Sequence, residues 1–593
     1  MKRMKKQTGF CRISALTMAA GSLLALNFCA CQSVTIAPAE KQNNLVSVLP
    51  VQEGEETGKY SFTTAENGWV YINFTASDPT SGKLEVTLDE ETVQLETMRY
   101  LSAGEHILVL PDCADGLLTV KRIPSIYVFA AGISFMPEVN GYYDYLTLQE
   151  RYLASTNLLH PGNMTTEAIH DYLSEGRKLL DNVHAAAVVE GDIPRFHEVI
   201  ANSRAMQHDE YAGFTVDEFN FTNDDELKAY PEALATLPDL KGRELYTWIY
   251  GDPREISEAQ RKFVAAALDE PQYGGKLLLE VYCRTRPTQA EAERFLDEKL
   301  ERNMQALKAI NPKIAERCGI ILGSFNLMPY ISLDHYPSVD YKVYLDMQMN
   351  RLANSEEFDQ LSMVGYWGNS LIDEDLQHWS LELLRHYCVE GKRTMLSDEY
   401  NYQYELPYLI NNDFKKGVEG WKATVGRDGA ITPQSNPTFA EDSIGIWQRG
   451  GSDAGDYFIV FKRGSEPNYL QQTAKSLTVG ETYMLEYVTA DYQDILHATV
   501  NPMDHVLHAE LPEENADVLS VREYIDMRPQ HFYGKTDFAR INLKQIIFKA
   551  KTSELPVTFT DHISTIVPGV GKFGQEKVLA FVRIKPFFPD VRK

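Results

Sequence analysis

Apolar and polar positions along the chain follow three successive patterns. From about residue 46 to 125, short apolar runs alternate with polar positions, and Gly, Asp and Pro separate them about every ten residues. From about 140 to 405, such runs alternate with stretches whose apolar residues recur every three or four positions. From about 406 to 593 the helical spacing disappears and strand-like runs return. These patterns predict a small β-sandwich, a helix-covered sheet and a second β domain.

The central region, 140–405, alternates short strands with amphipathic helices. One helix start is marked by Thr288, which has Glu291 three positions later and an apolar face after it. The candidate strands are 184–189, 213–216, 276–282, 319–325, 362–366 and 394–396. The length of the region fits the about 250 residues typical of a TIM barrel. We therefore predict a central (β/α)8 TIM-like barrel, with a doubly wound open sheet as the main alternative.

The first residues of the chain predict where the protein is located. Basic residues within the first six positions precede an apolar run over 13–28, which is typical of a secretory signal. Ala30 directly before Cys31 resembles the end of a bacterial lipoprotein signal, in which the cysteine is lipidated. We therefore expect a lipid anchor on Cys31, a polar tether over 32–45 and a location in the bacterial cell envelope, at the outer membrane or the cell surface. Ordinary cleavage and release of a soluble protein is the alternative.

Composition narrows the classes of partner. The chain has 57 basic and 84 acidic residues, a net charge of -27, which repels phosphate backbones and anionic membranes. We expect no nucleic acid partner, and membrane contact only through the lipid anchor. Beyond Cys31, the remaining cysteines are widely spaced and form no CxxC pair, so neither a disulfide scaffold nor a zinc site is expected.

The region from 406 to 593 carries a family resemblance. It opens with Asn411-Asn-Asp-Phe414, continues with Gly420-Trp421, and later has Leu477-Thr-Val-Gly480 before Tyr483. This order resembles the jelly-roll carbohydrate-binding modules of secreted glycosidases. The resemblance implies a C-terminal β-sandwich (jelly roll) and a glycan partner, although such domains also serve as structural caps. Trp447 and Tyr457 are candidate sugar-stacking residues or, equally, part of the sandwich core.

The whole arrangement resembles secreted multidomain bacterial glycoside hydrolases with a (β/α)8 barrel. The resemblance implies hydrolysis of an extracellular or envelope glycan by two carboxylates, one protonated and one ionised. A non-catalytic surface lipoprotein that binds glycan or protein is the alternative. The sequence contains no GxSxG, HExxH or P-loop motif. The GxGxxG match at 569–574 precedes a predicted strand rather than a helix, so we do not interpret it as a nucleotide site. We therefore expect no cofactor and no metal.

Catalytic candidates come from strand ends, because chemistry in such barrels lies at the carboxyl ends of the strands. Asp217 and Glu218 end a short apolar strand set among aromatic residues. Side chains alternate across a strand, so Thr215 and Asp217 are predicted to face the lumen. Glycosidase precedent favours Glu218 instead, and both remain candidates. A solvated strand end is the structural alternative.

A third catalytic candidate lies on the strand that begins near Leu277. Alternate residues from Leu277 to Val281 are apolar and would face the helices, which leaves Glu280, Tyr282 and Arg284 on the lumen face. We predict a catalytic role for Glu280 and substrate contacts for Tyr282 and Arg284. A structural ion pair between Glu280 and Arg284 is the alternative.

Polar and aromatic residues at two later strand ends complete the candidate set. Tyr366 and Trp367 would form a sugar-stacking floor, and Asn326 is a further substrate-binding candidate. The acidic run that starts at Asp373 also opens a helix, where carboxylates stabilise the amino terminus, so capping is its simpler explanation.

Overall fold

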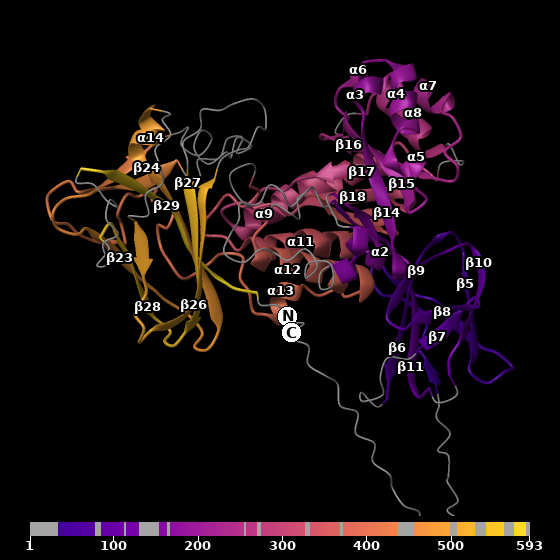
Figure 1. The fold of residues 1–593 in the computed structure, drawn as a ribbon, viewed down its shortest axis with the longest axis horizontal. Helices are drawn as coiled ribbons and strands as arrows, with labels where there is room; N and C mark the ends of the chain where they lie inside the picture. The colour runs from indigo at the N-terminus through magenta and orange to yellow at the C-terminus, as the bar shows by residue number, and fades with distance from the viewer. Residues whose placement is uncertain are drawn as a thin grey trace, which may run out of the picture.

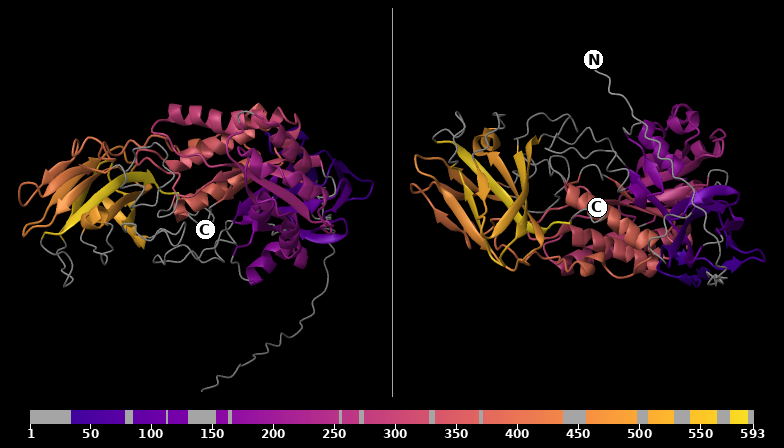
Figure 2. Two further views of the ribbon diagram at one scale, coloured as in Figure 1. Left: turned by 90° about the horizontal axis from the view of Figure 1, so that it is seen from above. Right: turned by 60° about the horizontal axis from the view of Figure 1, so that its bottom comes forward.

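The computed structural model describes residues 34–77, 85–111, 114–129, 153–162, 166–253, 256–269, 274–326, 332–367, 372–436, 456–497, 507–527, 541–562 and 574–588. A central barrel lies between two β domains, the N-terminal sandwich in indigo at the lower right of Figure 1 and the C-terminal domain in orange and yellow at the left. The two further views in Figure 2 keep the β domains on opposite sides of the barrel. The predicted fold class is therefore confirmed. Cys31, Trp447 and most of the 569–574 motif lie outside the described residues.

The N-terminal domain consists of two sheets that enclose apolar side chains such as Ile72, Leu108 and Val120, all fully buried. One sheet has the order β2-β3-β11-β6-β9, with β1 parallel to β11, and the other has the order β4-β5-β10-β7-β8. The strands are β1 (Val34–Ile36), β2 (Glu40–Lys41), β3 (Ser47–Val48), β4 (Val51–Glu53), β5 (Lys59–Thr64), β6 (Gly68–Ala76), β7 (Glu85–Leu88), β8 (Glu91–Gln94), β9 (Thr97–Leu101), β10 (Gly104–Val109) and β11 (Gly116–Ile123). The first two strands fall within the predicted tether.

Eight parallel strands form the closed barrel, because the last strand, β19, pairs with the first, β12. They are β12 (Ser125–Phe129), β13 (Leu158–His160), β14 (Lys178–His184), β15 (Tyr211–Asn220), β16 (Glu244–Tyr250), β17 (Lys276–Val281), β18 (Cys318–Gly323) and β19 (Met363–Trp367). Its lumen is filled by a separate apolar cluster that includes Tyr127, Leu180 and Leu278. A Cβ on Gly319 would lie 2.8 Å from Leu278 and 2.9 Å from Met363, so glycine makes room for these larger side chains.

Helices cover the outside of the barrel, and their apolar faces join one large core with the outward side chains of the strands. The α-helices are α2 (Thr166–Ser174), α3 (Ala186–Val189), α4 (Ile193–Ala201), α5 (Arg204–Gln207), α6 (Asp224–Leu227), α7 (Tyr230–Ala235), α8 (Glu258–Asp269), α9 (Gln289–Leu296), α10 (Arg302–Lys308), α11 (Tyr341–Asn354), α12 (Glu374–Leu384) and α13 (Leu396–Glu399). Short 3-10 or π segments lie at η2 (Leu153–Ser155), η4 (Asp297–Glu301), η5 (Ile314–Arg317), η6 (Glu356–Phe358) and η7 (Arg385–Val389). The predicted cap at Thr288 is confirmed, since its side chain accepts a hydrogen bond from the Glu291 amide.

The structure corrects several predicted strand positions. The barrel begins with β12, before the predicted boundary at residue 140. The predicted strand 184–189 covers the end of β14 and helix α3, and the predicted strand 394–396 leads into helix α13. No strand was predicted for β12, β13 or β16. β12 and β13 are short, with five and three residues, whereas the run of β16 was overlooked although Gly242 and Gly251 flank it.

The C-terminal domain is a sandwich of two antiparallel sheets, with the orders β20-β23-β28-β25 and β21-β22-β29-β24-β27-β26. Its elements are β20 (Lys422–Thr424), β21 (Ile431–Ser435), β22 (Tyr457–Lys462), β23 (Tyr469–Ala474), β24 (Thr482–Asp491), α14 (Tyr492–His497), β25 (His508–Glu510), β26 (Ala516–Met527), β27 (Ile541–Ala550), β28 (Leu555–Thr560) and β29 (Glu576–Pro586). Trp421 is buried among its core residues, and Tyr457 packs against the same core. Of the two interpretations of Tyr457, sugar-stacking residue or part of the sandwich core, the structure supports the second.

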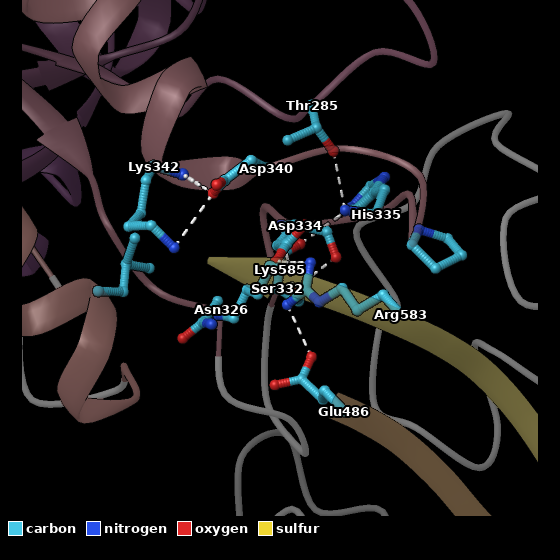
Figure 3. Close-up of polar contacts among 12 residues, drawn as sticks. Thr285, Asn326, Ser332, Asp334, His335, Asp340, Lys342, Glu486, Arg583 and Lys585 are labelled. Atoms are coloured by element: carbon cyan, nitrogen blue, oxygen red, sulfur yellow. Dashed lines mark hydrogen bonds and ion pairs between the residues drawn. The ribbon is translucent and has the colours of Figure 1, made fainter. Parts of the chain in front are cut away.

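Buried ion pairs join the C-terminal sandwich to two loops of the barrel. Arg583 of β29 lies between Asp334 of the barrel, at 2.5 Å, and Glu486 of β24, at 2.7 Å, as Figure 3 shows. Lys585 approaches Asp373 at 3.2 Å and Asp375 at 3.3 Å. Removal of one partner from such a buried pair is costly. The sandwich therefore holds the loops that follow β18 and β19 at the carboxyl end of the barrel.

Within these described ranges, no helix combines the length and the apolar character that crossing a bilayer requires.

Candidate active site

The inward face of β17 carries one of the predicted carboxylates. Leu277, Leu279 and Val281 pack outward against the helices, whereas Leu278 belongs to the lumen cluster. Glu280 has the same parity as Leu278 and lies two positions nearer the carboxyl end of the strand. The predicted alternation of β17 is therefore confirmed, and Glu280 points into the mouth of the barrel.

A β-bulge shapes the neighbouring strand, β15. Val216 pairs with Thr247 and Phe219 pairs with Ile249, so two residues of β15, Asp217 and Glu218, lie opposite the single residue Trp248 of β16. Glu218 has a backbone φ of 73°, in the left-handed region that residues other than glycine rarely adopt. The extra residue lets both Val216 and Phe219 pack outward. Bulges of this kind are frequent beside active sites, where they redirect side chains.

Asp217 faces the lumen, as strand parity predicts. Its Oδ2 accepts a hydrogen bond of 3.2 Å from Nδ2 of Asn182 on β14. Burial and the negative charge of Glu218 raise the pKa of Asp217 to about 6, against the opposite effects of Asn182 and His184. Asp217 is therefore mostly ionised at pH 7 although its side chain is partly buried.

Glu280 is the more weakly acidic of the two inward carboxyls. Trp248 donates its indole N–H to Glu280 Oε2 at 3.1 Å, and Tyr282 provides a second hydrogen bond. Burial and the charge of Asp217 outweigh both hydrogen bonds and raise the pKa of Glu280 to about 8. Asp217 ionises first, and its charge then opposes ionisation of Glu280. At pH 7 the mouth thus holds one carboxylate and one protonated carboxyl.

Glu218 occupies a different position from its neighbour. Its side chain is 61% exposed and lies 3.5 Å from Nδ1 of His184, itself 61% exposed, at the end of β14. The pair lies at the rim rather than in the lumen. Glu218 still acts on the inward groups, because its charge contributes to the raised pKa of both Asp217 and Glu280.

Aromatic side chains surround the inward carboxyls. The Tyr282 and Trp367 rings lie 5.6 Å apart at an angle of 30°, and Phe325 meets each of them edge to face at 5.3 Å. On the other side, Phe129 stacks on His160 with ring centroids 4.3 Å apart. Tyr282 and Trp367 are partly exposed and so provide ring surface at the mouth.

Arg284 follows Tyr282 on the same side of the chain and is partly exposed. Burial and the nearby Arg286 lower the pKa of its guanidinium. In the described part of the chain no ion pair joins Arg284 to Glu280, so the structural ion-pair alternative has no support. Arg284 remains a substrate-binding prediction.

Two other predicted contacts are corrected. Tyr366 faces outward from β19 and is fully buried in the core between strands and helices. Asn326 is buried too, and it exchanges hydrogen bonds with Asp373 at 2.9 and 3.1 Å, which links the loops after β18 and β19. Asp373 also caps helix α12 through the Leu376 amide, as predicted. Neither Tyr366 nor Asn326 is positioned to contact a ligand in the mouth.

Sequence reasoning missed several residues of the mouth, namely Asn182, His184, Phe129, His160 and Trp248. Trp248 is the most informative omission, because the run Glu244-Leu-Tyr-Thr-Trp-Ile-Tyr250 is rich in aromatic and β-branched residues, lies between Gly242 and Gly251, and could have been recognised as a strand. No three His, Cys, Asp or Glu side chains among the described residues gather in a way that could hold a metal ion.

No protein-family model matches the chain, and a search of curated proteins finds no match. Among solved structures, the chain is similar to a chitinase from Chromobacterium violaceum, at 12% identity over 44% of this chain and 98% of the chitinase, with a TM-score of 0.31. It is similar to Bacteroides uniformis β-glucuronidase 2, at 9% identity over 92% of this chain and 80% of that enzyme, with a TM-score of 0.33. It is also similar to the carbohydrate-binding module TmCBM61, solved with β-1,4-galactotriose, at 14% identity over 30% of this chain and 98% of the module, with a TM-score of 0.17. At these values no residue role transfers between the chains, so the roles below rest on geometry.

Proposed function

We propose that the protein is a glycoside hydrolase whose active site is the mouth of the barrel. The observation that carries this proposal is the pair Asp217 and Glu280, two inward carboxyls with pKa values of about 6 and about 8. Environments that separate the pKa values of two such groups provide an acid and a base at the same pH. Glycoside hydrolysis requires that combination.

In the proposed reaction, Glu280 donates its proton to the glycosidic oxygen as the bond to the anomeric carbon breaks. Ionised Asp217 either attacks the anomeric carbon or removes a proton from the water that does so. The exposed Glu218, on the outer rim, favours the protonated state of Glu280 through its charge. The indole of Trp248 holds Glu280 in place.

The aromatic residues of the mouth would hold the sugar. A sugar ring has one apolar face, which an aromatic ring can cover at little entropic cost. Tyr282 and Trp367 expose ring surface beside Glu280, while Phe325 supports both rings from the side. Arg284, which is partly exposed, would donate hydrogen bonds to the substrate. The C-terminal jelly roll is proposed as a second glycan-binding domain.

We further propose that Cys31 is lipidated and that the enzyme acts on glycans at the bacterial cell envelope. Metabolic labelling with a palmitate analogue tests this directly. Label should enter the wild type and be absent from Cys31→Ser. Equal labelling of the two would contradict the assignment.

The decisive experiment is a polysaccharide depletion screen, followed by kinetics on the substrate that it identifies. We expect Asp217→Asn to lower kcat by about 100- to 10,000-fold, the range for loss of an acid or base. Glu218→Gln, its matched neighbour on the rim, should retain activity within about tenfold. Activity should rise with pH as Asp217 ionises near pH 6 and fall as Glu280 loses its proton near pH 8. Unchanged turnover in Asp217→Asn would exclude this mechanism and leave the non-catalytic glycan-binding alternative.

A further inference from the structure

The C-terminal sandwich makes buried contacts with segment 332–340, the part of the connection that leads into helix α11. Arg583 of β29 pairs with Asp334 of this segment at 2.5 Å, and only 2% and 1% of the two side chains are exposed. Asn412 donates a hydrogen bond of 2.9 Å to the carbonyl oxygen of Pro337. Charged side chains are almost never fully buried unless they are paired. The ion pair therefore ties the segment to the sandwich.

Arg583 is itself held by its own sheet. It lies opposite Glu486 of β24, which lies opposite Gln545 of β27. Arg583 contacts one Glu486 oxygen at 2.7 Å, and Gln545 donates to the other at 2.7 Å. A planar guanidinium can place separate nitrogens on two carboxylates, here Glu486 and Asp334, as Figure 3 shows. Lys585, another cation near Asp334, has two carboxylate partners of its own. The position of Asp334 is therefore set from outside the barrel.

The residues on both sides of Asp334 form hydrogen bonds with the barrel. The Leu333 carbonyl accepts a hydrogen bond of 2.9 Å from the Thr285 amide, and the Leu333 amide donates one of 3.1 Å to the Phe325 carbonyl. The His335 amide donates to Thr285 Oγ1 at 2.9 Å, which Figure 3 also shows. Thr285 follows β17 and Phe325 follows β18. The ion pair at Asp334 therefore lies directly beside the carboxyl ends of two barrel strands.

The side chain of Leu333 packs against the aromatic residues of the mouth. A Cβ on Gly323 would lie 2.5 Å from a Leu333 methyl carbon, 2.9 Å from the Phe325 ring and 3.0 Å from the Tyr282 ring, so these three side chains meet at the glycine. Phe325 also meets Trp367 edge to face at 5.3 Å. Leu333 and Phe325 are fully buried, whereas Tyr282 and Trp367 are partly exposed. The two buried side chains therefore support the two rings that reach the mouth.

We propose that Arg583 is a positioning residue for the active site, which fixes the aromatic rings of the mouth through Asp334 and Leu333. The inference rests on the proposed function, because those rings would hold the sugar. Without the guanidinium, the tie from Asp334 to the sandwich is lost, whether its carboxylate turns toward water or takes up a proton. Leu333 then moves with Asp334, and Phe325 loses its support. The sandwich is thus a necessary part of the substrate-binding site rather than an independent module.

Hydrogen–deuterium exchange of the full chain tests the tie itself, without any need for hydrolysis. In Arg583→Met, the amides of Thr285 and Leu333 should exchange about tenfold faster or more, because local opening exposes them. The amides of β17 should keep their rates, since that strand pairs with β16 and β18. Lys577→Met is the matched control, because Lys577 lies on the same strand as Arg583 and pairs with Asp491 of the same sheet at 2.9 Å.

Two outcomes of the exchange experiment would overturn the proposal. Unchanged exchange at Thr285 and Leu333 in Arg583→Met would show that the guanidinium does not fix the segment. Equal acceleration in Lys577→Met would show a general loosening of the sandwich rather than a specific role for Arg583.

Kinetics on the polysaccharide from the depletion screen test the effect on the site. Arg583→Met should raise KM about tenfold or more, because buried aromatic anchors dominate such contacts. It should leave kcat within about threefold and both limbs of the pH–activity profile in place, because Asp217 and Glu280 lie on strands of the closed barrel. An unchanged KM, or a loss confined to kcat, would overturn the proposal. A wild type that hydrolyses no glycan would contradict the proposed function alone, and faster exchange in Arg583→Met would still establish the positioning role.

Asp334→Asn keeps both tests valid if Arg583→Met fails to fold. The amide has nearly the shape of the carboxylate but no charge, and Arg583 retains Glu486 as its partner. We expect the same direction of change in the exchange of the Leu333 amide and in KM. Wild-type exchange and KM in folded Asp334→Asn would overturn the proposal.

Discussion

The two ends of the barrel each hold a partly buried glutamate with aromatic hydrogen-bond donors, and the pKa values of the two are shifted in opposite directions. At the carboxyl end, Trp248 and Tyr282 donate to Glu280. At the amino end, Tyr100 and Tyr246 donate to Glu244. Burial raises the pKa of Glu280 to about 8, with Asp217 adding to the effect. Burial also opposes ionisation of Glu244, but Lys276, the two tyrosines and Lys178 together lower its pKa below the ordinary value.

The difference between these glutamates lies in the sign of the neighbouring charge rather than in burial or hydrogen bonding. Burial disfavours the charged form of a carboxyl at both ends. A neighbouring carboxylate reinforces that effect and produces a proton donor, whereas neighbouring lysines cancel it and produce a fixed anion. A raised pKa at the mouth and a lowered pKa at the amino end thus follow from one type of residue in two electrostatic settings.

The largest expected effect comes from Glu280→Gln at the carboxyl end. Glutamine cannot donate the proton that the leaving group needs, so we expect kcat to fall by about 100- to 10,000-fold. The folded state should hardly change, because Glu280 is already protonated at pH 7 and the amide has nearly the same shape. Chemical denaturation should show a loss of less than about 1 kcal/mol. A large loss of stability with full activity would reverse the comparison.

The same substitution at the amino end should give the opposite result. Glu244→Gln removes the anion that Lys276 and Lys178 share and leaves both cations in a poorly solvated site. We expect the free energy of unfolding to fall by about 2 kcal/mol, somewhat less than for a fully buried ion pair. Activity should stay within about twofold, since the mouth is at the other end of the barrel. Urea unfolding and kinetics on the same preparations check both points, and an unchanged stability would show that the lysines do not need this partner.

Only the carboxyl-end half of this contrast was accessible from the sequence, because it rests on strand parity, whereas Glu244 was not among the candidates. Alternation in β17 correctly placed Glu280 inward, and the same argument favoured Asp217 over Glu218. The bulge was not predictable, because Val216-Asp-Glu-Phe219 alternates poorly and nothing in it marks the left-handed residue. Glycine usually signals such a position, and here a glutamate occupies it.

The three-part fold was predictable because each region keeps its pattern of apolar positions over many residues. Errors in the position of single strands do not change that pattern. Strands such as β13, with three residues, are too short for their pattern to stand out. The prediction for Tyr366 was wrong because two neighbouring residues at a strand end were assigned to the same face of the strand. Tyr366 and Trp367 are adjacent, so only one can face the mouth. The prediction for Asn326 was wrong because its side chain forms a buried hydrogen bond with Asp373. That contact joins two loops far apart in the sequence, so no local pattern indicates it.

The smallest expected effect isolates the hydrogen bond from Trp248 to Glu280. That bond favours the ionised form of Glu280 and lowers its pKa, against burial and Asp217. Trp248→Phe keeps a ring in the lumen but removes the donor, so the pKa of Glu280 should rise above about 8. The alkaline limb of the pH–activity profile should therefore move to higher pH by about half a unit to one unit, since one unit corresponds to about 1.4 kcal/mol, close to one hydrogen bond. The acid limb, which reports Asp217, should stay in place. A downward shift of the alkaline limb would mean that Trp248 stabilises the protonated acid instead, and that neighbouring charge alone separates the two ends of the barrel.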